Sequence, residues 1–419
     1  MMLSLAAQAL TTANVSSAYP WQCQPAVAGL EPVIGLDVLG DGAVFGFDPF
    51  AAYGAGLVTN PNMVVLGQVG KGKSALIKSF LNRENLHGRR CVIVDPKGEY
   101  GPLAELVGLD VVRLHPGGTA RLNPLDADPG FDGNPAELGR RRARLIGALA
   151  ETGLSRLLTA LERAAIAAAV AEIGVDAVLA DVVELVGEPT PTMAARVRVP
   201  AAELAAGIRP AALELARLVD GDLADMFDGS TNVALDWDGP GLVIDVAAVF
   251  DTPALAPVMA CAGAWLAHAV ADANGPPTLL VLDEAWALLR LGGVCRWLAA
   301  TAKLARAYGV AVVLVAHRVS DFTAHGDDGA ETTKQAAGLL ADVETRVIYA
   351  QAPGETAAAA ALLGLDDGQT ELISCLPAHR ALWLIGRRPA VVDHVLSGAE
   401  RGVCDTATRM TANPNGFTP

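Results

Sequence analysis

Short apolar runs alternate with stretches of helical periodicity along most of the chain. Apolar runs of about four to eight residues are typical of buried strands, and apolar residues at every third or fourth position are typical of helices. When strands and helices alternate, the strands align in parallel and the helices cover the sheet. The pattern predicts an α/β protein with a mainly parallel central sheet, with strands at 63–66, 91–95, 111–114, 241–245, 278–283, 310–316, 346–350 and 382–385.

Residues 136–225 depart from this alternation. They are almost wholly Ala, Leu, Glu and Arg at helical spacing, and a break at 187–191 contains Gly187, Pro189 and Pro191. A linker rich in Pro, Gly and Asp precedes them at 126–135. We therefore expect an all-helical subdomain inserted into the α/β domain.

The two ends of the chain differ from its middle. A helix is expected at 3–14, a glycine-punctuated β segment at 33–48, and a polar loop at 321–331. Residues 401–419 have too few apolar side chains to pack well. The expected division is an N-terminal arm at 1–30, a first α/β part at 31–135, the helical insertion at 136–225, a second α/β part at 226–398 and a flexible tail at 399–419.

The segment from Gly67 to Ser74 satisfies the phosphate-loop pattern G-x-x-x-x-G-K-[ST], and it lies between an apolar run and a helical pattern. In that context the glycines let backbone N–H groups close around phosphate oxygens, and the helix N-terminus adds positive potential. Lys73 would reach the β- and γ-phosphates, and Ser74 would hold Mg²⁺. The segment predicts nucleotide binding, with ATP held by Gly67, Gln68, Val69, Gly70, Lys71, Gly72, Lys73, Ser74 and Ala75.

The charge balance is acidic. The 419 residues include 31 Lys and Arg and 46 Asp and Glu, which gives a net charge of −15. A broad non-specific DNA-binding surface is disfavoured, because neutralising phosphates requires clustered Lys and Arg. A local basic channel remains compatible with this balance, so DNA contact stays open but is not indicated by the charge.

The cysteines, the apolar runs and the start of the chain together bear on the location of the protein. The six cysteines are dispersed without C-x-x-C spacing, which makes reduced thiols the expected state. No charge-free apolar run reaches the length of about 18 residues that a transmembrane helix needs. The apolar start of the chain lacks a basic n-region. We expect no transmembrane segment and a cytoplasmic location.

Two adjacent carboxylates follow the apolar run at 278–282. Because ligands of α/β proteins bind at the carboxyl ends of the strands, Asp283 and Glu284 are placed where a nucleotide would lie. Asp283 would act on Mg²⁺, directly or through water, and Glu284 would orient or polarise the attacking water. Asp-Glu after a strand is common by itself, so this interpretation depends on its combination with the phosphate loop.

A second polar turn, from Asp95 to Tyr100, follows the apolar run at 91–94. It reads Asp-Pro-Lys-Gly-Glu-Tyr and would lie beside the nucleotide pocket. Taken alone, it is better explained as a helix N-cap with Glu99 in the first helical turn.

His317 and two arginines are the remaining candidates. His317 ends the strand expected at 310–316, where a polar residue next to the acidic strand could sense the γ-phosphate. Arg306 or Arg318 could act as an arginine finger in the site of a neighbouring subunit, although a surface charge explains either one equally well. The other histidines have no metal-ligand spacing, and no role is assigned to them.

Several stretches together resemble one family, the conjugative-transfer (type IV secretion) ATPases of the TraC-like branch in the HerA/FtsK division of phosphate-loop ATPases. The resemblance covers roughly residues 30–400. Its most specific parts are the Asp95–Tyr100 turn and the Asp-Glu-Ala-Trp sequence at 283–286, in that order after the phosphate loop. The other stretches are 47–49, 60–62, 122–126, 226–229 and 304–309.

The resemblance implies a RecA-like motor domain with an inserted helical region. It also implies a homo-oligomer, usually a hexamer, with ATP at subunit interfaces and membrane-associated secretion-channel proteins as partners. Such a protein would be peripheral at the inner face of the cell membrane. Two departures stand out. Only about thirty residues precede the β segment where relatives carry a large docking domain, so we expect a truncated or split member. His317-Arg318 also stands where relatives often have a Gln-containing sensor.

The sequence thus predicts a Mg²⁺-dependent ATPase that powers conjugative transfer or assembly of the transfer apparatus. Lys73 and Glu284 are the expected catalytic residues, with His317 as sensor and Ser74 and Asp283 on the metal. One alternative is a DNA translocase or coupling protein of the FtsK or TraG/TraD kind. Another is a structural subunit that binds nucleotide without turnover.

Overall fold

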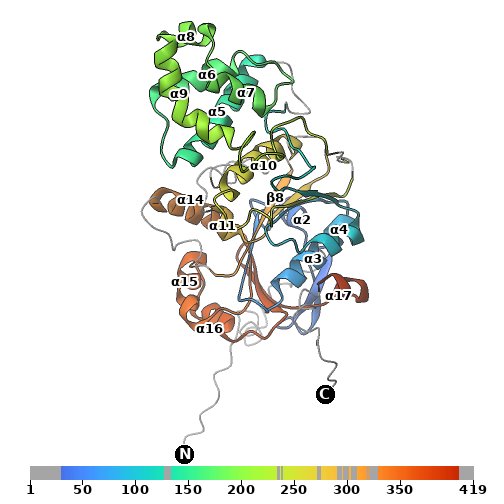
Figure 1. Cartoon of the computed structure of the whole chain (residues 1–419). Helices are drawn as coiled ribbons and strands as arrows, with labels where there is room; N and C mark the ends of the chain where they lie inside the picture. Colours follow the sequence, from blue (N-terminus) through green and yellow to red (C-terminus); the bar gives the residue numbers. More distant parts are fainter. Residues whose placement is uncertain are drawn as a thin grey trace, which may run out of the picture.

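The computed structural model describes residues 30–126, 134–233, 236, 239–270, 275–289, 295, 302, 309–318, 320 and 329–404. Figure 1 shows a large sheet covered by helices, with a further group of helices beyond one end of it. The helix expected at 3–14, most of the linker at 126–135, most of the loop at 321–331 and the chain beyond 404 lie outside the described residues.

One sheet contains the eleven described strands: β1 (Val33–Asp37), β2 (Ala43–Gly46), β3 (Met63–Leu66), β4 (Arg90–Asp95), β5 (Asp110–Arg113), β6 (Gly241–Asp245), β7 (Thr278–Leu282), β8 (Val310–Ala316), β9 (Thr345–Ile348), β10 (Arg380–Ile385) and β11 (Arg388–His394). Their order across the sheet is β2-β1-β11-β10-β9-β3-β8-β7-β4-β6-β5. All neighbours from β9 to β5 are parallel. The predicted mainly parallel sheet is confirmed.

Helices cover both faces of this sheet. One face packs against α2 (Pro49–Gly54), α3 (Lys73–Leu86), α4 (Gly101–Val107) and α17 (Gly398–Cys404). The opposite face packs against α10 (Leu255–Val270), α11 (Ala285–Leu289), α14 (Gly329–Ala341), α15 (Pro353–Leu363) and α16 (Asp367–Cys375).

Alternate side chains of each central strand enter the two cores. In β3, Met63 and Val65 pack into the core with α3 and α4, whereas Val64 and Leu66 pack into the core with α10 and α11. This alternation follows from the two-residue period of a strand. Because both faces are buried, the strand is apolar at every position, which is why it was visible in the sequence.

The sheet continues beyond β9 as an antiparallel part. Strands β10, β11, β1 and β2 are each antiparallel to their neighbours. The sequence predicted a strand at 382–385 without stating its direction, and it did not predict β11, which is added here. Only the turn at Gly386, which has a positive φ of 58°, separates β10 from β11, and a two-strand hairpin must be antiparallel.

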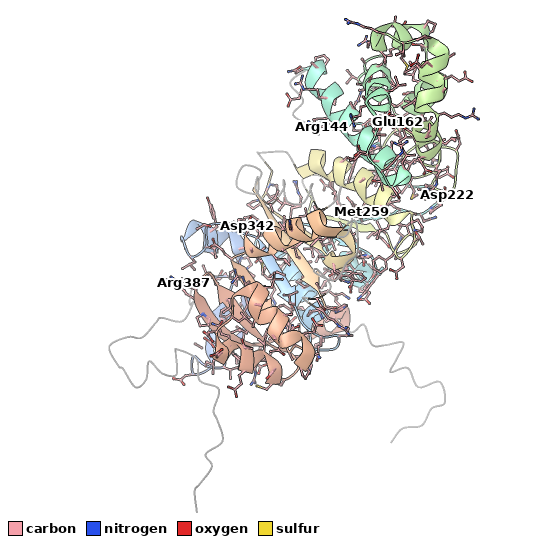
Figure 2. The ribbon with its side chains drawn as sticks, turned by 90° about the vertical axis from the view of Figure 1, so that its left-hand side faces the viewer. Arg144, Glu162, Asp222, Met259, Asp342 and Arg387 are labelled. Atoms are coloured by element: carbon pink, nitrogen blue, oxygen red, sulfur yellow. The ribbon has the colours of Figure 1, made fainter. Side chains whose placement is uncertain are left out.

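Five helices form the group beyond the sheet: α5 (Pro135–Leu154), α6 (Ala160–Val170), α7 (Leu179–Gly187), α8 (Pro191–Val197) and α9 (Ala201–Ala216). They pack on one another, and α5 also contacts α10 of the α/β part. Figure 2 shows this group, with Arg144 and Glu162, set apart from the α/β part. The buried Arg142 of α5 donates to the carbonyl of Leu125 (2.6 and 2.9 Å) and so anchors the group. Among the described residues, no helix is both long and apolar enough to cross a membrane.

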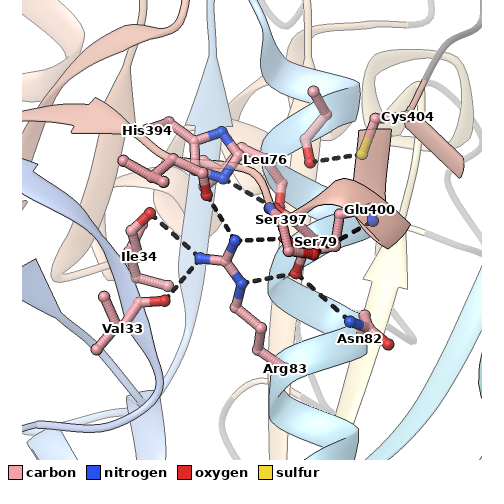
Figure 3. Close-up of polar contacts among 12 residues, drawn as sticks. Val33, Ile34, Leu76, Ser79, Asn82, Arg83, His394, Ser397, Glu400 and Cys404 are labelled. Carbon is pink, nitrogen blue, oxygen red and sulfur yellow. Dashed lines mark hydrogen bonds and ion pairs between the residues drawn. The ribbon is translucent and has the colours of Figure 1, made fainter. Parts of the chain in front are cut away.

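The end of the described chain is not a free tail. Residues 398–404 form α17, which packs on α3, although the sequence predicted a flexible tail from 399. Figure 3 shows one reason, the pair between Arg83 of α3 and Glu400 (2.6 Å). Arg83 also donates to the carbonyl of Val395 (2.5 Å). The apolar composition of this segment did not predict the helix, because the ion pair between Arg83 and Glu400 holds α17 on α3.

Candidate functional site

The phosphate loop leaves β3 at Leu66 and enters α3 at Lys73. Its backbone requires glycine at two points. Gly72 has a φ of 110°, which side-chain-bearing residues rarely adopt, and a Cβ on Gly67 would come within 2.4 Å of the Tyr349 Cβ. The two glycines therefore allow the tight backbone path that a phosphate-binding loop needs.

Segments outside the motif hold the loop in place. The Gln68 N–H donates to the carbonyl of Ala350 (3.1 Å), just after β9, and the His379 N–H donates to the carbonyl of Lys71 (2.8 Å). His379 precedes β10, so the antiparallel part of the sheet supports the outer wall of the loop. Sequence analysis gave His379 no role, and no local motif marks it.

Lys73 is buried, and its ammonium donates to the carbonyls of Gly67 and Gln68 (3.0 Å to the latter). Burial lowers the pKa of Lys73 to about 8, although the nearby carboxylates of Glu284 and Asp283 oppose that shift. The side chain is thus still mainly a cation at pH 7. Ser74 and Ala75 follow it in the first turn of α3.

Asp283 and Glu284 follow the last residue of β7 and are both buried. One oxygen of Asp283 accepts from the Tyr100 hydroxyl (3.2 Å), and the other accepts from the Glu284 N–H (2.9 Å). Burial raises the pKa of Asp283, and the charge of Glu284 adds to this effect. A divalent cation would relieve that unfavourable charge, so the group suits the metal role predicted for it.

Glu284 is enclosed by donors. Its carboxylate contacts the ammonium of Lys97, the Nε2 of His317 (2.6 Å) and the indole N–H of Trp286 (2.5 Å). Burial alone would raise the pKa of Glu284, but the hydrogen bonds from His317, Lys97 and Trp286 outweigh it and lower the pKa to about 2. The side chain is therefore a carboxylate at neutral pH.

The turn from Asp95 to Tyr100 is built around the Asp95 side chain. That carboxylate accepts from the N–H groups of Lys97 (3.1 Å), Gly98 (2.9 Å) and Tyr100 (2.9 Å). The expected helix N-cap is wrong, because α4 begins only at Gly101, with Tyr100 in the cap position. Asp95 shapes the turn itself, which points Lys97 at Glu284.

The other predicted residues divide into two groups. His317 follows β8, and the structure brings it onto Glu284. Arg318 is exposed next to it. Arg306 lies outside the described residues.

Within the described residues no group of three His, Cys, Asp or Glu side chains could hold a metal ion by itself. A cation here would instead need Ser74, Asp283 and phosphate oxygens together, and the phosphate loop and the buried Asp283 fit that arrangement.

Neighbouring strands deliver these groups. The phosphate loop follows β3, His317 follows β8, Asp283 and Glu284 follow β7, and the turn with Lys97 follows β4. These strands are consecutive in the sheet and parallel. The sequence therefore predicted that the site lies at the carboxyl edge of the sheet. It did not predict that Lys97, Tyr100 and Trp286 contact the two carboxylates, since their proximity arises only on folding.

One family model matches part of the chain. The family model for the central domain of the helicase HerA matches residues 58–140, which include the phosphate loop and the 95–100 turn. No curated protein matches the sequence.

Solved structures match over most of the chain. The structure of VirB4 of Thermoanaerobacter pseudethanolicus has a TM-score of 0.73 at 22% identity, covering 90% of this chain and 99% of that chain. The bacterial conjugative coupling protein TrwB, in its TrwBdeltaN70 form, has a TM-score of 0.57 at 18% identity, covering 80% of this chain and 85% of that chain. TrwB in complex with ADP and Mg²⁺ has the same TM-score and identity, covering 80% and 86%. The chain therefore has the RecA-like phosphate-loop NTPase fold of VirB4 and TrwB.

Proposed function

We propose that this protein is a Mg²⁺-dependent ATPase that acts as a motor of a conjugation or type IV secretion system. The observation that carries the proposal is the single sheet edge at which the phosphate loop, Asp283, Glu284 and His317 meet. The HerA match over 58–140 and the fold shared with the conjugative coupling protein TrwB support it.

Each group has a distinct task in this proposal. The loop from Gly67 to Ala75 and the Lys73 cation hold the phosphates, while Ser74 and Asp283 hold the metal. The bound Mg²⁺ supplies charge neutralisation at the phosphates. Glu284 orients the attacking water, and His317, which already touches Glu284, reports on the terminal phosphate.

The assembly belongs to the same proposal. We propose a homo-oligomer, most simply a hexamer, in which Arg306 or Arg318 of one subunit completes the site of the next. It would lie peripherally at the inner face of the cell membrane against secretion-channel proteins. The family resemblance in the sequence motifs supports this arrangement.

A second candidate is a DNA translocase or coupling protein. The similarity to the coupling protein TrwB and to the central domain of a helicase favours it. The two candidates share the ATPase site and differ in substrate. If duplex or single-stranded DNA stimulates hydrolysis and binds with a strong salt dependence, the second candidate is correct.

The test is steady-state ATP turnover by purified wild-type protein and by Lys73→Ala and Glu284→Gln, each with and without Mg²⁺. Both variants should lose about 10²-fold or more in kcat, because each removes a group that acts on the reacting phosphate or water. Unchanged turnover in either variant contradicts the assignment. Nucleotide binding by a wild-type protein that does not hydrolyse ATP would instead indicate a structural subunit.

A further inference from the structure

Both carboxylate oxygens of Glu284 already contact other side chains, whereas a residue that orients an attacking water needs an oxygen that the water can contact. Three donors from three separate elements already contact its carboxylate: Lys97 after β4, His317 after β8 and Trp286 in α11. One oxygen, Oε1, faces both Lys97 and His317, and Oε2 accepts from the Trp286 indole. Only 3% of the Glu284 side chain is exposed.

The backbone also fixes this arrangement. Glu284 has a φ of 48°, an uncommon conformation for a residue with a side chain, at the junction between β7 and α11. Such strain persists when surrounding contacts determine it, and it tends to occur at functional positions. The three donors are those contacts.

Lys97 reaches Glu284 because its turn is rigid. The almost fully buried Asp95 accepts three backbone N–H groups of the turn, and Gly98 reverses the chain with a φ of 67°. The Lys97 Nζ also lies 3.4 Å from the His317 Nε2. Lys97 therefore contacts both the proposed water-orienting group and the proposed phosphate sensor, and 35% of its side chain is exposed.

An ammonium on a carboxylate competes with water for the same oxygen. A charge-assisted contact is about twice as strong as a neutral hydrogen bond, so water does not displace it easily. Lys97 is mobile in principle, since it is a point charge on a flexible four-carbon stem. It can leave Glu284 when a stronger anion comes within its reach.

We infer that Lys97 is a positioning residue that restrains Glu284 in a resting orientation, and that this ion pair must open before Glu284 can orient water. The inference rests on the proposed ATPase function and adds a residue that limits turnover at the same site. Turnover in the resting protein is then limited by a residue that the phosphate-loop and Asp-Glu motifs do not contain.

The experiment compares wild type with Lys97→Met, Lys97→Arg and the control Lys334→Met. Lys334 is exposed in α14, and its substitution changes the net charge by the same amount. The first readout needs no nucleotide: hydrogen exchange of the backbone at 283–289, measured by mass spectrometry. Lys97→Met should raise exchange at 283–289 and leave β3 unchanged, whereas Lys97→Arg and Lys334→Met should match wild type.

The second readout separates kcat from KM. Lys97→Met should raise kcat several-fold with KM and the Kd for a fluorescent ADP unchanged, and Lys97→Arg should restore the wild-type kcat. A fall in kcat that Lys97→Arg rescues would overturn the inference, because Lys97 would then act directly on the reacting phosphate. An unchanged kcat together with unchanged exchange would overturn it as well.

Failure of the proposed function is distinguishable from failure of this inference. If wild-type protein shows no turnover that depends on Lys73, the ATPase proposal fails, and the exchange at 283–289 alone decides whether Lys97 restrains Glu284. If turnover depends on Lys73 but Lys97→Met behaves as wild type in both readouts, only the restraint is wrong.

Discussion

Two buried carboxylates, Glu284 and Glu400, have similar surroundings and different tasks. Each side chain is only 3% exposed, and each has neighbouring donors that outweigh burial and lower its pKa to about 2. Glu284 lies at the carboxyl edge of the parallel strands, while Glu400 lies in α17 against α3 (Figure 3).

The cations that pair with Glu284 and Glu400 differ in their other contacts. Arg83, the cation at Glu400, also donates to the backbone carbonyls of Val33 (2.6 Å) and Val395 (2.5 Å), so it ties three segments together. Lys97, the cation at Glu284, makes no such contact with a backbone carbonyl in the part of the chain that the structure describes, and its charge lies near Lys73 of the phosphate loop. A cation that also donates to backbone carbonyls of other segments indicates a structural pair, whereas a cation whose contacts are side chains at the carboxyl edge of the sheet indicates a site.

The largest effect should follow from Asp283→Asn, which changes the proposed metal ligand beside Glu284. Turnover should fall by about 10²-fold or more, because a neutral amide is a poor partner for the metal. The thermal midpoint should not fall, since burial raises the Asp283 pKa and the folded protein gains by losing that charge. Steady-state kinetics and calorimetry measure the two. A lower midpoint together with normal turnover would reverse the assignment.

Arg83→Met should have the opposite profile. Removing one partner of a buried pair leaves Glu400 without its cation, which costs about 3 kcal/mol of unfolding free energy. Denaturant unfolding measures this loss. Turnover per folded molecule should fall much less than in Asp283→Asn, and a loss of turnover without loss of stability would contradict the structural role of the Glu400 cluster.

His394 gives the structural cluster a pH dependence. Burial, helped by the charge of Arg83, lowers the pKa of His394 from 6.5 to about 4, and its Nε2 lies 2.8 Å from the Ser79 hydroxyl. Because the unfolded state then binds more protons, stability should fall as the pH drops from about 6.5 to about 4, by up to about 3 kcal/mol. His394→Gln should flatten this part of the pH profile of unfolding.

The smallest effect should come from Ser397→Ala. The Ser397 hydroxyl accepts from the Glu400 N–H (3.3 Å), and Glu400 accepts from the Ser397 N–H (2.8 Å), which together form a capping box at α17. Loss of this cap should cost about 1 kcal/mol of unfolding free energy and leave ATP turnover unchanged. A change in turnover larger than the change in stability would show that α17 acts on the site.

The sequence was informative where a signal is local. Strands buried on both faces are apolar at every position, so β3, β4 and β7 were found, and the phosphate loop carries its own glycine pattern. Asp283 and Glu284 were located because they follow such a strand directly.

Contacts made by distant segments were not predictable in this way. Lys97 and Glu284 are far apart in the sequence, and nothing local to either one states that they pair. Arg83 and Glu400 are also far apart in the sequence, and their ion pair holds α17 at a position where the sequence predicted a flexible tail. β11 was missed because its apolar stretch is only three residues long, from Ala390 to Val392, and polar residues and a proline flank it.

One matched pair of substitutions tests the account most directly: ATP turnover of Glu284→Gln against that of Glu400→Gln, with Mg²⁺ and at equal folded concentration. The same chemical change is then made in both buried clusters. The account predicts that Glu284→Gln loses about 10²-fold or more in kcat, while Glu400→Gln keeps turnover near the wild-type value. Equal turnover in the two variants would contradict it.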